Sequence, residues 1–201
     1  MDMAVSLVQA YLRINGYFTV SEYPILEADG PRGYSVATDL DILAFRFPGA
    51  GRRVAGAGPE AGGFEPDPAL GCPADRGDML IGEVKEGRAV LNAAARDPEV
   101  LRTALARFGC CPAKDADEVA RRLIAKGTVD TPHGHRVRLA AFGGTAPRQR
   151  GVDLTMTLSH VAGFIRDYMR EHWEVLHHAQ FKDPALAFFM VLEKAEKARD
   201  T

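Results

Sequence analysis

Two short acidic patterns in the chain contain residue types that could carry out hydrolytic chemistry. Asp39 and Asp41 lie two residues apart in one apolar run, and Glu83 and Lys85 lie two residues apart in another. Side chains two apart in a β-strand point to the same face of the sheet, and an unpaired carboxylate in an apolar strand is costly. If the two strands are neighbours, two or three carboxylates and one ammonium group converge on a small region.

Converging carboxylates repel each other unless a cation or a proton lies between them. A hard divalent ion such as Mg²⁺, bound by one or two carboxylates and by phosphate oxygens, removes this repulsion. Such an ion can activate a water molecule and stabilise negative charge on a phosphorane-like transition state, while Lys85 contacts the water or the phosphate. The alternative is an ion-pair ladder on a partly exposed sheet face, because one Glu-x-Lys in 201 residues is unremarkable by composition.

The hydrophobic pattern predicts the elements that position these residues. An amphipathic helix is expected over 4–15, where Val5, Val8 and Leu12 recur at helical spacing and Asn15 and Gly16 end it. Three consecutive strands favour antiparallel neighbours, and a later strand is expected to return through a crossover. The predicted strands are 17–25, 34–47, 79–85 and 136–142, and the further predicted helices are 97–108, 115–126, 154–180 and 183–198.

A glycine- and proline-rich stretch divides the predicted core. Residues 48–78 contain eight glycines and five prolines in 31 positions, which predicts a surface insertion that contributes little to the core. We therefore expect a core over 1–150 that carries this insertion, and C-terminal helices over 151–201 that pack on it. The insertion contains Asp67 after a proline, an alternative acid to Asp41. We favour Asp41, because Asp67 lies between prolines and a catalytic carboxylate needs a rigid central strand.

The sequence resembles the PD-(D/E)xK nuclease superfamily, which includes restriction endonucleases and Holliday-junction resolvases. The residues concerned are Asp-Ile-Leu-Ala from Asp41 and Gly-Glu-Val-Lys ending at Lys85, after an amphipathic helix. The resemblance covers roughly residues 4–142. It implies an α/β fold with a restriction-endonuclease-like mixed central sheet flanked by helices, built from a helix, three strands, a helix and a strand, to which the chain adds a C-terminal helical pair. It also implies phosphodiester hydrolysis at a Mg²⁺ or Mn²⁺ ion bound by Asp41 and Glu83, with Lys85 at the attacking water.

The chain departs from the superfamily pattern at three places. The residue before Asp41 is Leu40 rather than proline, and Glu83 follows Asp41 by 42 residues because of the insertion. The first helix lacks the glutamate that many members carry there, which leaves open whether one or two metal ions bind. Gln9 is the amide that this helix offers in its place, and Gln9 and Asp39 are our candidates for a supporting position beside the metal ligands.

The charge distribution favours a nucleic-acid partner for the second half of the chain. The net charge of −2 divides into −6 over residues 1–100 and +4 over residues 101–201. A polar segment over 131–152 has no acidic residue and contains four arginines, Arg136, Arg138, Arg148 and Arg150. Arginines of this kind contact phosphates, and we expect Arg136 and Arg138 to do so, with DNA favoured over RNA. A solvated basic edge is the alternative.

The sequence also limits the compartment and the partners. The chain has no run of 18 apolar residues, so no membrane span is predicted. No signal peptide is expected, and three cysteines are too few for a disulfide framework. These features favour a cytoplasmic protein without a membrane partner. Phe188, Phe189 and Met190 could form a homodimer seam instead of packing on the core.

Three function classes follow from these observations. The first is a Mg²⁺- or Mn²⁺-dependent endonuclease-like hydrolase. The second is a catalytically inactive nuclease-like domain that binds nucleic acid or a protein partner. The third is a structural protein that dimerises through its helical C-terminus.

Overall fold

The computed structural model describes residues 2–28, 30, 33–51 and 65–199. The α-helices and strands, in chain order, are α1 (Met3–Ile14), β1 (Phe18–Ala28), β2 (Tyr34–Arg46), β3 (Asp78–Arg88), α2 (Pro98–Arg107), α3 (Ala116–Lys126), β4 (Thr128–Asp130), β5 (Arg136–Thr145), β6 (Leu154–Thr157), α4 (Leu158–Glu171), α5 (Trp173–Leu176) and α6 (Pro184–Lys197). The 3-10 turns η2 (Pro68–Leu70), η3 (Ala94–Arg96) and η4 (Ala113–Asp115) lie between them.

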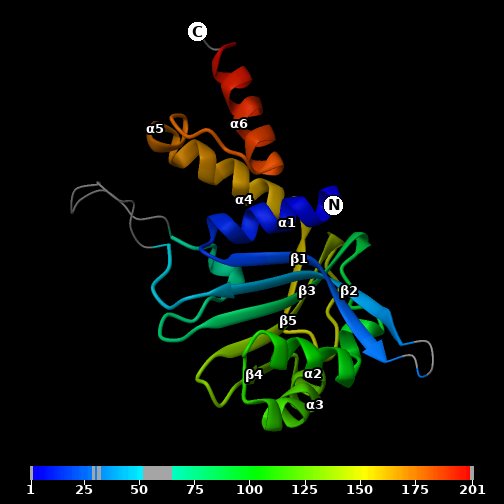
Figure 1. The fold of residues 1–201 in the computed structure, drawn as a ribbon. Coiled ribbons are helices and arrows are strands. Elements are labelled where there is room, and N and C mark those ends of the chain that lie inside the picture. The colour runs from blue at the N-terminus through cyan, green and yellow to red at the C-terminus, as the bar shows by residue number, and fades with distance from the viewer. Residues whose placement is uncertain (1, 29, 31–32, 52–64, 200–201) are drawn as a thin grey trace.

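The strands form a six-stranded mixed sheet, which confirms the predicted α/β class (Figure 1). The order is β1-β2-β3-β5-β4, with β6 also paired to β5. Strands β1, β2 and β3 are antiparallel neighbours, and β5 runs parallel to β3. The chain crosses from β3 to β5 through α2 and α3, as expected because parallel strands need a long connection.

Helices cover the sheet on both faces and divide the core into two clusters (Figure 1). One cluster lies between the sheet and α1 and α4 and extends to α6, which packs on these two helices, and the other lies between the sheet and α2 and α3. Strand β3 contributes to both, since Leu80 and Val84 enter the first cluster while Met79 and Ile81 enter the second. Alternation into two apolar layers explains why this strand is apolar throughout its first half.

Helix α1 follows the predicted pattern closely. Asp2 caps it, because its side chain accepts a hydrogen bond of 2.9 Å from the backbone N–H of Ala4. Val8 and Leu12 are fully buried. The helix ends at Asn15 and Gly16, where φ of +85° requires a left-handed conformation that glycine adopts without strain.

The prediction of one helix over 154–180 was wrong. Residues 154–157 form strand β6, with Leu154 and Met156 buried on one side of it. The helix begins only after Thr157, whose Oγ1 accepts a hydrogen bond of 3.1 Å from the N–H of His160. The helical region is then divided between α4 and α5. Two β-branched threonines in alternation with apolar residues are a strand pattern, which the longer apolar stripe of α4 hid.

The C-terminal helices pack onto α1 and onto each other. Both Arg166 and Arg170 of α4 bind Glu193 of α6, at 2.9 Å and 2.7 Å, and α6 is capped by Asp183 as predicted. Strand β6 lies beyond residue 150 and belongs to the sheet, so the sheet extends into the C-terminal part of the chain. Within the described residues no helix is long and apolar enough to cross a membrane.

The end of the predicted insertion is tightly attached to the core. Residues 52–64 lie outside the described residues, but Leu70 is fully buried and the carboxylate of Asp67 is also buried. Asp67 Oδ2 accepts a hydrogen bond of 2.7 Å from the Tyr11 hydroxyl. The same oxygen lies 2.6 Å from His160 Nε2. The expectation that 48–78 gives little to the core was therefore wrong for residues 67–70, which join α1 to α4.

Candidate functional site

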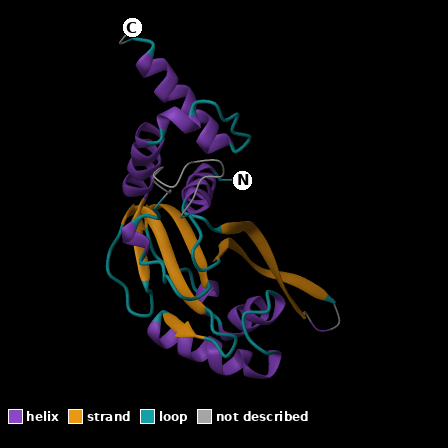
Figure 2. Cartoon of the chain, turned by 90° about the vertical axis from the view of Figure 1, so that its left-hand side faces the viewer, coloured by secondary structure: helices purple, strands orange, loops and turns teal. Residues whose placement is uncertain are grey.

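The predicted acidic residues lie where strands β2 and β3 stop pairing. The β2–β3 ladder ends at the pair Ile42–Gly82, whereas β2 stays paired with β1 to its first residue. The β1–β2 hairpin therefore extends beyond the rest of the sheet (Figure 2). Just beyond the ladder, Asp41 Oδ2 accepts a hydrogen bond of 2.8 Å from the backbone N–H of Val84. This bond fixes the Asp41 carboxylate between the two strands.

The structure brings Asp41, Glu83 and Lys85 together at this point. Alternation along β3 puts Glu83 and Lys85 on one face of the sheet. The Lys85 ammonium contacts Oε1 of Glu83 directly, and its Nζ lies 4.0 Å from Oδ2 of Asp41. The two carboxylates therefore share one cationic group.

A residue that sequence reasoning missed, Asn92, holds the Glu83 side chain. Its Nδ2 donates a hydrogen bond of 2.9 Å to Glu83 Oε1. Its Oδ1 accepts one of 2.6 Å from the N–H of Ala95 at the turn η3, which fixes the amide. Asn92 lies in the connection after β3, and no spacing rule links it to Glu83. Only the fold shows the contact.

The electrostatics of the site follow from burial and from the shared ammonium. Burial raises the pKa of Glu83 above the ordinary carboxyl value, and the nearby Asp41 charge raises it further, while the hydrogen bonds from Lys85 and Asn92 oppose both effects. Burial by itself lowers the pKa of Lys85, but its attraction to Glu83 and Asp41 outweighs this and raises it. Lys85 is therefore protonated at neutral pH and acts as a cation rather than as a base.

Asp41 and Glu83 are the residues of this site that could hold a hard divalent cation. In the described part of the chain, the hydrogen bonds and ion pairs of Asp41 fall on Oδ2 and those of Glu83 fall on Oε1. Their second oxygens remain for a further ligand. Mg²⁺ is commonly bound by one or two carboxylates together with waters and substrate oxygens. Among the described residues no group of three or more His, Cys, Asp or Glu side chains is placed to hold a metal ion, so the set is limited to two acids.

A strained residue, Glu22, lies on β1 at the level of Asp41 on the neighbouring strand β2. The β1–β2 register places Glu22 between the pairs Ser21–Ile42 and Tyr23–Leu40. Its φ of +52° is the left-handed region, which non-glycine residues seldom adopt and which is concentrated at functional sites. The sequence gives no sign of this backbone conformation.

The two candidates for supporting positions lie away from the carboxylates. Gln9 is buried on α1, and its Nε2 donates a hydrogen bond of 3.4 Å to Ser21 Oγ. Asp39 is exposed on the β1–β2 hairpin, where it pairs with Pro24. Within the described residues neither side chain contacts Asp41 or Glu83.

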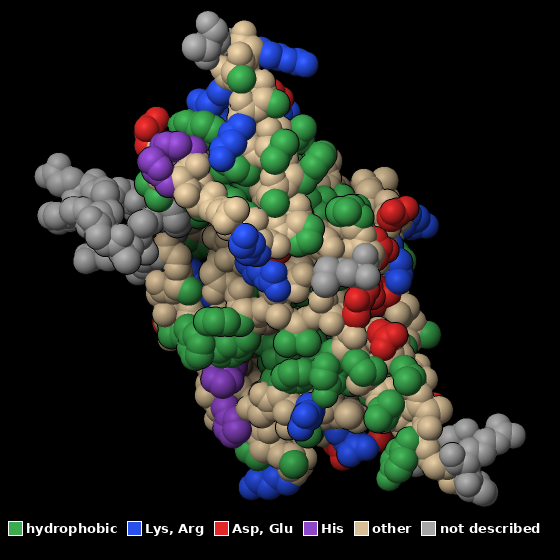
Figure 3. Space-filling model, turned by 45° about the horizontal axis from the view of Figure 1, so that its top comes forward, with side chains coloured by type: hydrophobic (Ala, Val, Ile, Leu, Met, Phe, Trp, Pro, Cys, Tyr) green, Lys and Arg blue, Asp and Glu red, His purple; other side chains and the backbone are tan. Residues whose placement is uncertain are grey.

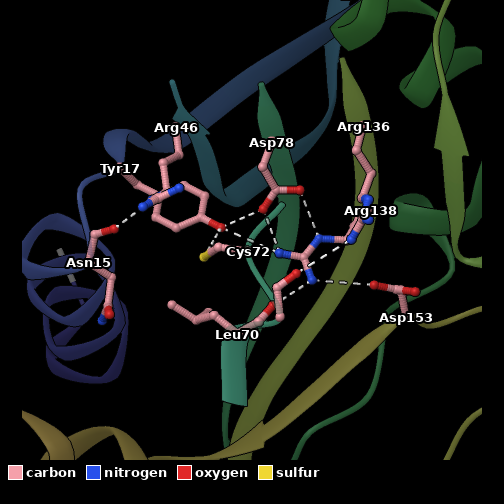
Figure 4. A network of polar contacts seen from close by, with 10 residues as sticks. Asn15, Tyr17, Arg46, Leu70, Cys72, Asp78, Arg136, Arg138 and Asp153 are labelled. Atoms are coloured by element: carbon pink, nitrogen blue, oxygen red, sulfur yellow. Dashed lines mark hydrogen bonds and ion pairs between the residues drawn. The ribbon is translucent and has the colours of Figure 1, made fainter. Parts of the chain in front are cut away.

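The prediction that Arg138 contacts phosphate was wrong. Its side chain is 3% exposed and binds Asp78 through Nε (3.0 Å) and Nη2 (2.5 Å), as Figure 4 shows. Its Nη1 also donates 2.8 Å to the carbonyl of Leu70. Asp78 is fully buried and accepts a further hydrogen bond from Tyr17. Arg138 is therefore part of an internal ion pair and is not accessible to a ligand.

Arg136 is accessible, but it lies at the other end of the strand from the carboxylates. In the β3–β5 register Arg136 stands opposite Asp78. Asp78 precedes Glu83 by five residues along β3. At a rise of 3.3 Å per residue this is about 16 Å. A phosphate held at Asp41 and Glu83 is therefore beyond the direct reach of Arg136.

Basic residues on the carboxylate side come from the ends of β3 and β5. Arg88, Arg148 and Arg150 are exposed, and Arg88 stands opposite Thr145. Gly143 of β5 lets the chain that follows β3 pass close to it, because a β-carbon at position 143 would lie 2.8 Å from Ala89 Cα.

Comparison of the sequence and structure with known proteins gives no match. This holds for protein-family models, for curated proteins and for solved structures.

Proposed function

We propose that this chain is a metal-dependent nuclease that hydrolyses phosphodiester bonds, with DNA as the expected substrate. The single observation that carries the proposal is the meeting of Asp41, Glu83 and Lys85 at the point where β2 and β3 separate. Two carboxylates with free oxygens beside a protonated lysine suit a phosphodiester, which is an anion that needs both a metal ion and a positive charge.

We also propose the restriction-endonuclease-like class for the fold. The order α1, three antiparallel strands, α2 and α3, then β5 parallel to β3 supports it, since this is the core that the sequence resemblance implies. The site lies at the carboxyl end of β3, next to its parallel neighbour β5. Ligands commonly bind outside the carboxyl ends of parallel strands in open α/β sheets.

In the proposed reaction, Asp41 and Glu83 would hold Mg²⁺ or Mn²⁺, and a metal ion bound there would lower the pKa of a water molecule and offset charge on the phosphate. The Val84 N–H keeps the Asp41 carboxylate in place, and Asn92 does the same for Glu83. The Lys85 ammonium contacts the phosphate or the attacking water and attracts developing negative charge.

The exposed Arg88, Arg148 and Arg150 replace Arg136 and Arg138 as the proposed phosphate contacts. Lys85 stands opposite Gly143 and Arg88 opposite Thr145, because the register shifts between them, so the two lie two ladder positions apart, about 7 Å. This separation suits neighbouring phosphates of one strand of nucleic acid. Contacts of this kind add affinity that falls as salt concentration rises.

The test is cleavage of supercoiled, linear and branched DNA with Mn²⁺ or Mg²⁺, using wild type, Asp41→Asn, Glu83→Gln and Lys85→Met. Asp39→Asn is the matched control, because Asp39 is an exposed carboxylate two residues from Asp41. We expect each site variant to lose activity by about 100-fold or more, with the control unchanged and chelator abolishing cleavage. Folded wild type without activity, or equal activity in all variants, would contradict the proposal.

A second candidate is an inactive domain that binds a protein partner, and an apolar groove favours it. The groove has a volume of about 390 Å³ and lies on β1 and β2, where β1 is the free edge of the described sheet. It is lined in part by Phe18, Phe45, Phe47 and Phe108, and Phe18 is 70% exposed. Extended peptides add to free sheet edges beside such grooves. Absence of Mn²⁺ binding in calorimetry, with folding intact, would favour this candidate.

A further inference from the structure

Helix α6 carries apolar residues on two opposite sides. Leu186 and Met190 are buried against the body of the protein. A second stripe consists of Phe188, Val191, Leu192 and Ala195, at the spacing i, i+3, i+4 and i+7. At 100° per residue its centre lies almost opposite the buried side. A helix that is apolar on both sides is usually covered on both sides.

The second stripe is open in the single chain. Phe188 is 61% exposed, Val191 63% and Leu192 41%, and Ala195 is also exposed. Helix α6 projects from the end of the molecule (Figure 2), and hydrophobic side chains are visible along this projecting part (Figure 3). Neither the sheet nor the proposed nuclease site contributes to this surface.

We propose that the open stripe of α6 pairs with the same stripe of a second copy of this chain, antiparallel about a two-fold axis. The axis passes between Val191 and Leu192. This places Phe188 of one copy against Ala195 of the other, and Val191 against Leu192. A large ring meets a methyl group at both ends, so the stripe is complementary to itself, as an isologous interface requires.

The arrangement of sizes selects the antiparallel pairing over a parallel one. A parallel pair in register would place Phe188 on Phe188 and Ala195 on Ala195, which crowds one end and leaves a void at the other. It would also place the exposed Lys194 beside its own copy. In the antiparallel pair Lys194 stands at the level of Phe189, so like charges are kept apart.

The charged side of α6 remains free to make its internal contacts in this pairing. Glu193 binds Arg166 and Arg170 of α4 on the buried side, away from the open stripe. The stripe spans eight residues, about 11 Å of helix, so the interface is small and belongs to the weak, reversible class.

Disulfide trapping tests the pairing and its direction. Phe188→Cys and Ala195→Cys are made singly, and each is oxidised alone and mixed with the other. Facing β-carbons within about 4.5 Å can form a disulfide. We expect a covalent dimer in the mixture and none in either variant alone. Wild type, with Cys110 and Cys111 buried and Cys72 partly buried, is the baseline.

Sedimentation of wild type and Val191→Glu provides the second measurement. Val191 is exposed in the single chain, so the substitution leaves the monomer folded, and we expect it to abolish concentration-dependent dimerisation. A disulfide dimer of Phe188→Cys with itself would show a parallel pair and overturn the proposal. So would a folded mixture that does not cross-link, or a wild-type chain that stays monomeric at about 1 mM.

Discussion

Replacing Arg138 by methionine separates an internal ion pair from a ligand contact. Arg138 and Asp78 are joined by two hydrogen bonds, of 3.0 Å and 2.5 Å, with exposed side-chain fractions of 3% and 0%. The pair connects β5 to β3, and Arg138 also binds the carbonyl of Leu70. Methionine keeps most of the apolar volume and removes the charge and the donors. Asp78 is then left buried with Tyr17 as its remaining side-chain donor.

The expected loss is large for one substitution. Removing one partner of a buried ion pair costs about 3–5 kcal/mol, because the other charge stays buried without compensation. In a chain of this length, 1 kcal/mol corresponds to roughly 2–4 °C in Tm. We therefore expect Arg138→Met to lower Tm by about 6–20 °C. The double variant Asp78→Leu, Arg138→Met removes both charges and should recover part of this loss.

The assay is urea unfolding together with DNA binding, with Arg136→Met as the matched control. Arg136 is partly exposed and donates one hydrogen bond of 3.4 Å to the carbonyl of Gly71, so its loss should cost under about 1 kcal/mol. If Arg138→Met unfolds no more easily than Arg136→Met but binds DNA more weakly, Arg138 is a ligand contact and our interpretation of the pair is wrong.

Three further predictions follow from single residues. Folding raises the pKa of Glu83 above the ordinary carboxyl value. Between these two pKa values the folded protein binds more protons than the unfolded chain, so its stability falls as pH rises through that window. Glu83→Gln removes this loss, and we expect it to raise Tm at pH 8, measured in chelator, and to raise it by less at pH 4. Leu70→Ala should cost about 2–5 kcal/mol, because Leu70 is fully buried, and unchanged urea unfolding would show that residues 67–70 are dispensable. Gly143→Ala should cost at least about 1 kcal/mol, since the added β-carbon would lie 2.8 Å from Ala89 Cα; thermal unfolding compared with Gly163→Ala, where nothing lies within 4 Å, checks it.

The sheet was predictable because its strands are local and continuous. The second half of β2 and the first half of β3 are apolar runs, and the short connection between β1 and β2 favours antiparallel neighbours. Strands β4 and β6 were missed. Each has three or four residues, and such short segments exist as strands only because β5 offers them an edge.

The part of the candidate site that follows from the alternation of side chains along strands was predictable. Glu83 and Lys85 share a face because they are two apart in a strand, and Asp41 reaches them because β2 neighbours β3. Asn92 and Glu22 could not be predicted. The contact of Asn92 depends on the path of a loop, and the positive φ of Glu22 occurs inside a strand, where no residue type in the sequence marks it.

The choice of Arg136 and Arg138 as phosphate contacts lacked one piece of information, the register of β5 against β3. Arg136, Arg138, Arg148 and Arg150 are equivalent by composition, and only the register of β5 against β3 distinguishes them. Parallel pairing puts Arg136 beside Asp78, at the start of both strands, and therefore puts residues after β5 near the end of β3. Glu83 lies in the second half of β3, so arginines that follow β5 lie on its side and those that begin β5 do not. The sequence predicted a crossover but not this register, so the arginines that follow β5 become the proposed phosphate contacts only once the register is known.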